Sequence, residues 1–278
     1  MDILKSLFPE NCFDNDIIIA HNLFIKENTE KVIEFFKKHD NNLAKIFIDN
    51  IDNLEYQDYR KRRLIHYICH LSTPEMIKYI IDKGVDLECK DYEEWRPIHY
   101  ICQYLTPEII KYIIDKGVDL EYEDNIKWRP IHYICQYSTP EMIKYIIDKG
   151  VDLECENNYK WRPIHFICLH STPEMIKYII DKGVDLECEN NHQWRPIHFI
   201  CQYSTPEMIK YLVDYGVNVN VKNDEDKLLI NYVKDEEMKA YVRVHMDYQL
   251  AITNELYMNG YQMALRKLFS NSTKSARK

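Results

Sequence analysis

The chain has 278 residues, of which 45 are acidic and 36 are basic, so its formal net charge is −9. This acidic balance disfavours a general binder of the nucleic-acid backbone and favours a protein partner that carries a basic patch. The N-terminus has no basic lead-in to an apolar segment, and no run approaches the ~18 apolar residues of a membrane span. We therefore expect neither a classical secretory signal nor a membrane protein.

The chain is built on a sequence repeat with a fixed period of about 33 residues. Three residue types recur at this interval, and they are His66, His99, His132, His165 and His198, then Gly84, Gly117, Gly150, Gly183 and Gly216, then Trp95, Trp128, Trp161 and Trp194. Self-similarity at a period of 20 to 50 residues is typical of stacked repeat proteins. Eight of the nine cysteines also fall at repeat-equivalent positions, which predicts a reducing, intracellular compartment rather than a disulfide framework.

In chain order, residues 1–28 carry no repeat signal and are interpreted as an N-terminal capping segment, in which 16–25 could form a short helix. Residues 29–58 hold a degenerate repeat, because 45–58 aligns with 111–124. Five clear repeats span 59–222, and 223–245 is a shortened repeat that caps the array. Residues 246–278 are predicted as a C-terminal helix and a basic disordered tail, with a helix break at Asn259 and Gly260.

Each repeat predicts two helices. Pro130 suits the first turn of a helix, and Ile131, Ile134 and Cys135 share one face of it. A second helix begins after Ser138 or Thr139, whose hydroxyl is a typical N-cap, and its apolar stripe is Met142, Ile143, Ile146 and Ile147. Gly150 ends this helix at a position that needs a left-handed backbone. The polar stretch 151–160 is predicted as a hairpin-like finger that links to the next repeat.

A helix, a turn, a helix, a glycine and a finger within each period resemble the ankyrin repeat. The Thr-Pro-Leu-His signature of that family stands here as Arg129, Pro130, Ile131 and His132, and Gly-Ala-Asp stands as 150–152. The resemblance covers about 29–245 and implies an all-α fold, an ankyrin-repeat solenoid of stacked helix-turn-helix units with hairpin-like fingers. Near-perfect tandem copies are similar to the arrays of large DNA viruses or protists. We expect a cytoplasmic protein, in the host cytoplasm if the source is viral.

Two positions depart from the family pattern. Arginine replaces the threonine whose hydroxyl usually caps the first helix. The finger-tip glycine is replaced at Glu94, Lys127, Lys160 and Gln193. We expect the neighbouring Asn157, Asn158, Asn190 and Asn191 to adopt the unusual backbone conformations instead.

His132 and Cys135, three residues apart on one helix and repeated along the chain, are residue types that bind metals, but the expected geometry argues against a metal site. One helix face offers only this pair, and neighbouring helices lie roughly 8 to 10 Å apart, whereas zinc takes four ligands at about 2.0 to 2.3 Å. The resemblance implies that the five repeated histidines form structural hydrogen bonds. A catalytic site should be a single constellation, yet each histidine has four equivalents. We predict no enzyme activity, no metal and no cofactor.

Aromatic residues form two candidate binding rows. Trp95, Trp128, Trp161 and Trp194 precede the first helices, and Tyr104, Tyr137, His170 and Tyr203 occupy a second position that the resemblance places on the concave groove. Tryptophan, tyrosine and arginine dominate interface hot spots, which favours a recognition surface. The alternative is that each tryptophan packs on the next repeat and serves stability alone, and the near-identity of the copies favours this alternative for the tryptophans.

The finger is where the copies differ, reading KDYEE, EDNIK, ENNYK and ENNHQ. We therefore place partner-specific contacts at Tyr92, Glu93, Ile126, Tyr159 and His192. The predicted function is a monomeric protein–protein interaction scaffold with an unknown protein partner. One alternative is an adaptor whose C-terminal helix recruits effector machinery such as a ubiquitin ligase. A single-stranded nucleic-acid binder is disfavoured by the acidic balance.

Overall fold

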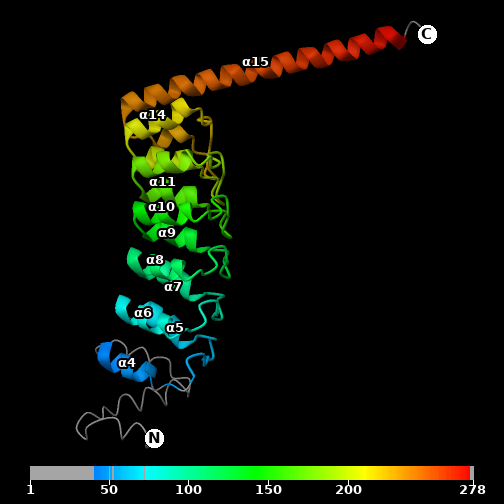
Figure 1. Ribbon diagram of the computed structural model, residues 1–278. Helices are drawn as coiled ribbons and strands as arrows, with labels where there is room; N and C mark the ends of the chain where they lie inside the picture. The colour runs from blue at the N-terminus through cyan, green and yellow to red at the C-terminus, as the bar shows by residue number, and fades with distance from the viewer. Residues whose placement is uncertain (1–40, 50, 52, 72, 276–278) are drawn as a thin grey trace, which may run out of the picture. The chain divides into compact units, whose positions relative to one another are not determined.

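The computed structural model describes the fold of residues 41–275 apart from 50, 52 and 72, and describes side chains as far as Asn259 (Figure 1). The chain divides into two compact units, 1–158 and 159–278. The capping segment predicted at 1–28, with its short helix, and the first part of the degenerate repeat lie outside the described residues. The domain boundaries drawn from the sequence stay predictions.

The first unit contains seven described helices. They are α4 (Asn41–Asp49), α5 (Leu64–Leu71), α6 (Pro74–Asp82), α7 (Pro97–Tyr104), α8 (Pro107–Asp115), α9 (Pro130–Tyr137) and α10 (Pro140–Asp148). Within this unit first helices pack on first helices, as α5 on α7 and α7 on α9, and second helices pack on second helices, as α4 on α6 and α6 on α8. The fold of this unit is thus a stack of helix pairs, and the buried isoleucines between them form its core.

The second unit repeats the pattern and ends differently. Its elements are α11 (Pro163–His170), α12 (Pro173–Ile180), α13 (Pro196–Tyr203), α14 (Pro206–Tyr215), the 3-10 helix η1 (Leu229–Tyr232) and α15 (Glu236–Ser275). The only bridge outside helices that is described joins Lys222 and Leu228. No helix in the described part of the chain is both long enough and apolar enough to span a membrane.

Helix ends follow from single residues. Thr139 caps α10, where its hydroxyl oxygen accepts the Met142 N–H at 3.3 Å, and Pro140 occupies the first turn. The first helices lack a threonine cap, and His132 takes over part of that role because its Nδ1 accepts the Arg129 N–H at 3.0 Å. Gly150 follows α10 with φ of +86°.

Two expectations about the backbone are wrong. The left-handed residues of the fingers are not the asparagines but Lys61, Glu94, Lys127, Lys160, Gln193 and Asp226, with φ between 54° and 63°. The reason is that a buried Asp or Asn side chain near the start of the finger accepts two backbone N–H groups, as Asp124 does. This loop requires a left-handed backbone at the residue three positions later, here Lys127. The helix α15 also continues through Asn259 and Gly260 to Ser275. A helical glycine costs only about 1 kcal/mol, and the good helix formers Met258, Gln262 and Met263 lie in the same turns.

Candidate binding surface: the fingers and the aromatic rows

Each finger is folded around one buried side chain. Asp124 is only 4% exposed, and its Oδ1 accepts the N–H groups of Ile126 and Trp128 at 2.9 and 2.8 Å. Asn190 does the same for His192 and Trp194 at 2.9 and 3.0 Å. The finger is therefore a rigid Asx-type loop, in which a local side chain replaces the backbone hydrogen bonds of a hairpin.

Neighbouring finger tips are joined by backbone atoms. Asn125 donates its N–H to the carbonyl oxygen of Glu93 at 3.1 Å, and Asn158 donates to Ile126 at 3.0 Å. In the second unit Asn191 donates to Tyr159 at 3.0 Å, and Asp224 donates to His192 at 3.1 Å. The accepting residues, Glu93, Ile126, Tyr159 and His192, are the positions at which the repeats differ. These backbone bonds are the same whatever side chain the accepting residue carries.

The side chains of the fingers lie mostly in solvent. Tyr92 is 74% exposed and Tyr159 is 53% exposed, whereas Ile126 is half-buried. The imidazole of His192 lies 2.9 Å from Asp224 Oδ2 and is also exposed. Sequence reasoning missed Tyr59, which stands one full period before Tyr92 and is 59% exposed. The repeat spacing alone was sufficient to find it.

The two aromatic rows have different surroundings. Trp95 is half-buried, with its ring 4.9 Å from that of Tyr100 in its own repeat and 5.2 Å from that of Tyr133 in the next. Trp194 is placed in the same way between Phe199 and Tyr232, at 5.0 and 4.9 Å. Trp128 and Trp161 also pack on the aromatic residue five positions later, at 4.8 and 4.7 Å. Trp95, Trp161 and Trp194 thus connect consecutive repeats, and all four tryptophans are half-buried.

The second row is open to solvent. In the first unit Tyr104 and Tyr137 are 49% and 52% exposed at the ends of α7 and α9, and in the second unit Tyr203 is 57% exposed at the end of α13. The cysteine two positions before each tyrosine is buried. We refer to Tyr104, Tyr137 and Tyr203 as the tyrosine row. An exposed aromatic ring on a rigid helix end is well suited to bind a partner at low entropic cost.

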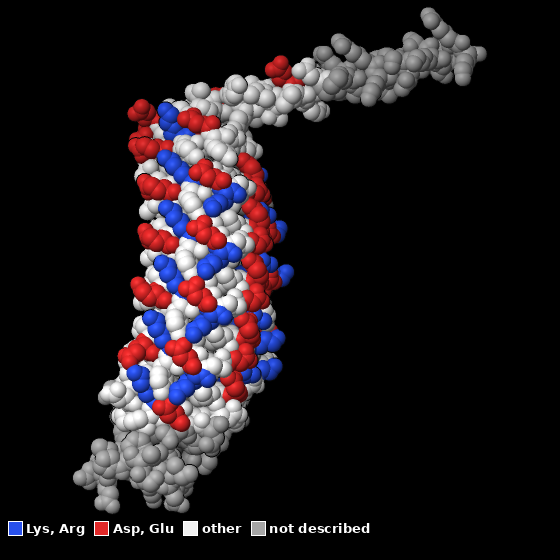
Figure 2. Space-filling model, viewed as in Figure 1, with Lys and Arg blue, Asp and Glu red and all other residues white. Residues whose placement is uncertain are grey.

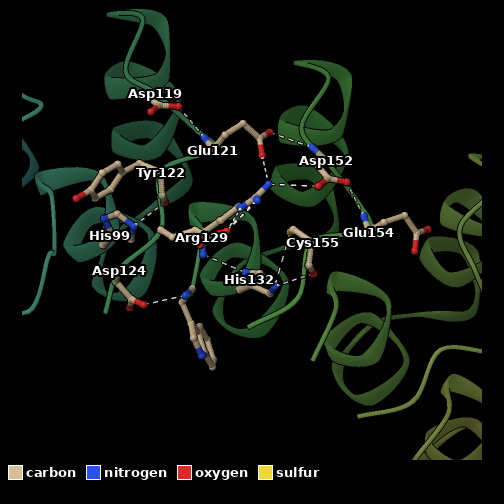
Figure 3. Close-up of polar contacts among 12 residues, drawn as sticks. His99, Asp119, Glu121, Tyr122, Asp124, Arg129, His132, Asp152, Glu154 and Cys155 are labelled. Atoms are coloured by element: carbon tan, nitrogen blue, oxygen red, sulfur yellow. Dashed lines mark hydrogen bonds and ion pairs between the residues drawn. The ribbon is translucent and has the colours of Figure 1, made fainter. Parts of the chain in front are cut away.

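The repeated histidines lie in the core. His132 is fully buried, and because its Nδ1 accepts a backbone N–H, its proton lies on Nε2, which donates to the carbonyl oxygen of Cys155 at 3.3 Å (Figure 3). His99 makes the same contact with Tyr122, also at 3.3 Å. Burial lowers the pKa of His99, and it lowers the pKa of His198 to about 4. His99 and His132 thus tie the first helix of their repeat to the start of the finger that follows it, whereas His198 Nε2 lacks this partner.

A charged network connects the repeats on their polar side. The Arg129 guanidinium contacts Glu121 at 2.6 Å, Glu123 at 2.8 Å and Asp152 at 3.3 Å, so that it spans two repeats (Figure 3). The same Glu121 accepts the Asp152 N–H at 3.0 Å. In the second unit Arg195 contacts Glu187 and Glu189 at 2.5 and 2.8 Å. The arginines beside the tryptophans are thus bound by acids within the chain.

The surface carries no field of one sign on the face in view. Figure 2 shows lysine and arginine side chains interleaved with aspartate and glutamate along the repeats. Among the described residues no group of three or more His, Cys, Asp or Glu side chains could hold a metal ion. One pocket of about 430 Å³ lies beside α15, where it is lined by Gly216, Asn218, Asn220, Gln249, Leu250, Ile252 and Thr253.

A family model described as ankyrin repeats, in three copies, matches residues 32–124 and 131–223. The chain belongs to the ankyrin-repeat family. Its fold is an all-α ankyrin-repeat solenoid, as the sequence predicted. No curated protein matches the sequence.

Solved ankyrin-repeat structures share this fold at low sequence identity. The ankyrin repeat domain of Bcl-3, a member of the IκB family, is 13% identical with a TM-score of 0.55, over 81% of this chain and 97% of that one. That of human ASB11 is 14% identical with a TM-score of 0.60, over 81% and 96%. A structure of a predatory endopeptidase from Bdellovibrio bacteriovorus in complex with an immunity protein matches at 15% identity with a TM-score of 0.55, over 69% of this chain and 99% of that one. Ankyrin repeats in general mediate protein–protein interactions.

Proposed function

We propose that this ankyrin-repeat protein is a non-enzymatic interaction module that binds another protein through its finger side chains and its tyrosine row. The observation that carries the proposal is that backbone atoms of the fingers make the hydrogen bonds between repeats, while the side chains differ from copy to copy. Backbone atoms of Glu93, Ile126, Tyr159 and His192 join the repeats, so the side chains at these positions vary between copies without loosening the stack. Variation at loop positions where the backbone makes the contact between repeats is typical of a recognition surface.

A protein partner fits the charges better than a nucleic acid does. The net charge is −9, and the arginines that stand beside the tryptophans are already bound by glutamates. Phosphate binding would have to break these ion pairs. The eight described cysteines are buried and form no disulfide with one another, and burial raises the pKa of Cys155 to about 12. Such unreactive thiols are compatible with an intracellular protein.

Replacement of the finger side chains tests the proposal. A variant with serine at Tyr92, Glu93, Ile126, Tyr159 and His192 should keep the wild-type circular dichroism spectrum and lose the bound partner in affinity capture. The matched control carries serine at Glu108, Glu141, Glu174 and Glu207, which are exposed in the first turns of the second helices, and should retain the partner. Identical capture by the finger variant and the wild type would reject the assignment.

An adaptor is the second candidate, in which α15 recruits effector machinery such as a ubiquitin ligase. Exposed apolar side chains on its distal part favour this candidate, since Leu256 and Tyr257 are 67% and 73% exposed. Capture with a chain that ends at Thr253 separates the two roles. Gln249 is kept in this chain because it donates to the Val217 carbonyl oxygen at 2.8 Å and so holds α15 on the last repeat. Loss of a subset of captured proteins would identify the effector.

A further inference from the structure

The first turns of α15 are the second helix of a sixth repeat. Asp235 caps the helix, since its Oδ1 accepts the Met238 N–H at 2.7 Å. The Tyr241 hydroxyl of α15 donates to Asp214 of α14. The equivalent bond in the first unit runs from the Tyr145 hydroxyl to Asp115 and measures 2.6 Å. Val242 is fully buried on the same side. This part of α15 closes the stack in the way that any following repeat would.

The opposite side of α15 lacks the residues that would couple a further repeat. In α14 the Lys210 ammonium lies 5.5 Å from the Tyr241 ring centre, and Asp214 accepts the Tyr241 hydroxyl. Thirty residues later these two positions hold Ala240 and Val244. Both are exposed, and Val244 is exposed by 66%. The ladder of charged contacts ends here, and an apolar surface takes its place.

This surface continues along the helix as a regular row of four apolar residues and one glutamate. Val244, Tyr248, Ala251, Glu255 and Met258 follow one another at spacings of four and three residues, and all five are exposed. Alternation of three and four keeps residues on one face and is the seam pattern of paired helices. We call these five residues the outer row. With about 100° of rotation per residue, Val242 lies about 160° around the helix from Val244.

The helix is anchored on its inner side only. The Gln249 side chain accepts the Val219 N–H at 3.0 Å and donates to the Val217 carbonyl oxygen at 2.8 Å. Asn220 donates to the carbonyl oxygen of Met246 at 2.9 Å. The outer row therefore stays accessible while the stack holds the helix. Figure 1 shows α15 continuing past α14, and its 40 residues extend about 33 Å beyond Thr253.

We propose that the outer row is an interface between two copies of this chain, whose α15 helices pack antiparallel. In proteins most of the stability of a helix comes from packing of one of its faces, and an exposed seam of three-four spacing fits a second helix. A dimer then replaces the monomer expected from the sequence. The outer row lies on the side of α15 opposite Gln249, so this pairing leaves the contacts of Gln249 with Val217 and Val219 in place.

Charge selects the antiparallel direction. The register that pairs Val244 with Glu255 of the second copy also pairs Tyr248 with Ala251, and it brings Arg243 of each copy beside Glu255 of the other. A parallel pair would instead place the two Glu255 side chains against each other, where like charges repel. Antiparallel helices also align their dipoles favourably. The two α15 helices are therefore expected to pair antiparallel, with Val244 of one copy opposite Glu255 of the other.

Sedimentation of the full-length chain over a dilution series tests the dimer. The expected result is a reversible equilibrium between one and two chains of 33.6 kDa. Tyr248→Glu should raise the dimer dissociation constant by at least about tenfold, since it places a charge in the seam. Tyr257→Glu is the matched control, because Tyr257 is 73% exposed on the same helix but lies outside the outer row. It should leave the dissociation constant unchanged.

Two further measurements test the register. Arg243→Glu and Glu255→Arg should each weaken the dimer, and the double variant should restore it. Nitroxide labels at position 258 should lie roughly 25 to 30 Å apart in the antiparallel pair, against roughly 10 Å in a parallel one. A chain that stays monomeric, equal weakening by Tyr257→Glu, or the short label distance would each overturn the proposal. A monomer whose α15 captures a different protein would assign the row to the adaptor role.

Discussion

The pairing of Asp124 with Tyr133 yields the sharpest test of how the fingers are held. The Tyr133 hydroxyl donates to Asp124 Oδ2 at 2.7 Å in the core. Burial, and then the bond to the carboxylate, raises the pKa of Tyr133 well above its ordinary value, so the hydroxyl stays a donor. Later repeats replace the pair by Asn190 and Phe199. The carboxylate and its tyrosine donor are thus lost together.

Tyr133→Phe creates the one pairing that the described repeats do not use, an aspartate opposite a phenylalanine. The buried carboxylate loses its donor, and an unsatisfied buried acceptor costs about 1 to 3 kcal/mol. Asp124→Asn together with Tyr133→Phe recreates the pair of the later repeats and should recover most of this loss. Asp124→Asn alone should cost less than about 1 kcal/mol, because a tyrosine oxygen can also accept from an amide.

The last finger supplies a matched control. Asn223 Nδ2 donates to the Tyr232 hydroxyl at 2.8 Å. Tyr232→Phe therefore removes the equivalent hydroxyl without leaving a buried carboxylate that has lost its donor. Urea unfolding followed by circular dichroism measures the global effect, and hydrogen exchange at the Ile126 and Trp128 amides measures the local one. The reasoning is refuted if Tyr133→Phe is no more destabilising than Tyr232→Phe, or if the double variant is as unstable as Tyr133→Phe.

Three further outcomes are expected from the backbone and the core histidines. Lys127→Gly should raise the urea midpoint, with a gain of up to about 1 kcal/mol, because glycine removes the strain of a left-handed residue at φ of +59°. Gly150→Ala should lower the free energy of unfolding by about 1 to 2 kcal/mol although no atom lies within 4 Å of the added methyl group, since φ there is +86°. Burial lowers the pKa of His198 to about 4. The neutral form is favoured in the folded state, so stability should be full above about pH 6.5 and fall towards pH 4, with a shallower fall in His198→Gln.

Local signals were sufficient to predict the helices of the repeats. Pro130 and Pro140 begin α9 and α10, and Gly150 follows the second of these helices, as the sequence indicated. These residues act through the backbone of their own turn, so no knowledge of the neighbours is needed. The same holds for the fold class, because a fixed sequence period implies that each repeat packs against a copy of itself.

The finger conformation could not be predicted in this way. Asparagine tolerates a left-handed backbone better than lysine does, which is why we expected Asn157 and its neighbour to adopt it. Propensity is overruled here because the Asx side chain is fixed by two N–H groups of its own loop, and the turn falls on Lys127 instead. A conformation imposed by a neighbouring side chain cannot be found from the preference of the residue itself.

The partner-binding residues remain a prediction for a related reason. Contacts between repeats leave a trace in a single sequence because each must recur, as the bond from Tyr145 to Asp115 recurs between Tyr241 and Asp214. A partner is not periodic, so its contacts leave a trace only as differences between copies. Such differences accumulate where each repeat is joined to the next by backbone atoms, which are the same in every copy. The finger tips meet this condition, whereas the tryptophans, which pack on side chains of two repeats, do not.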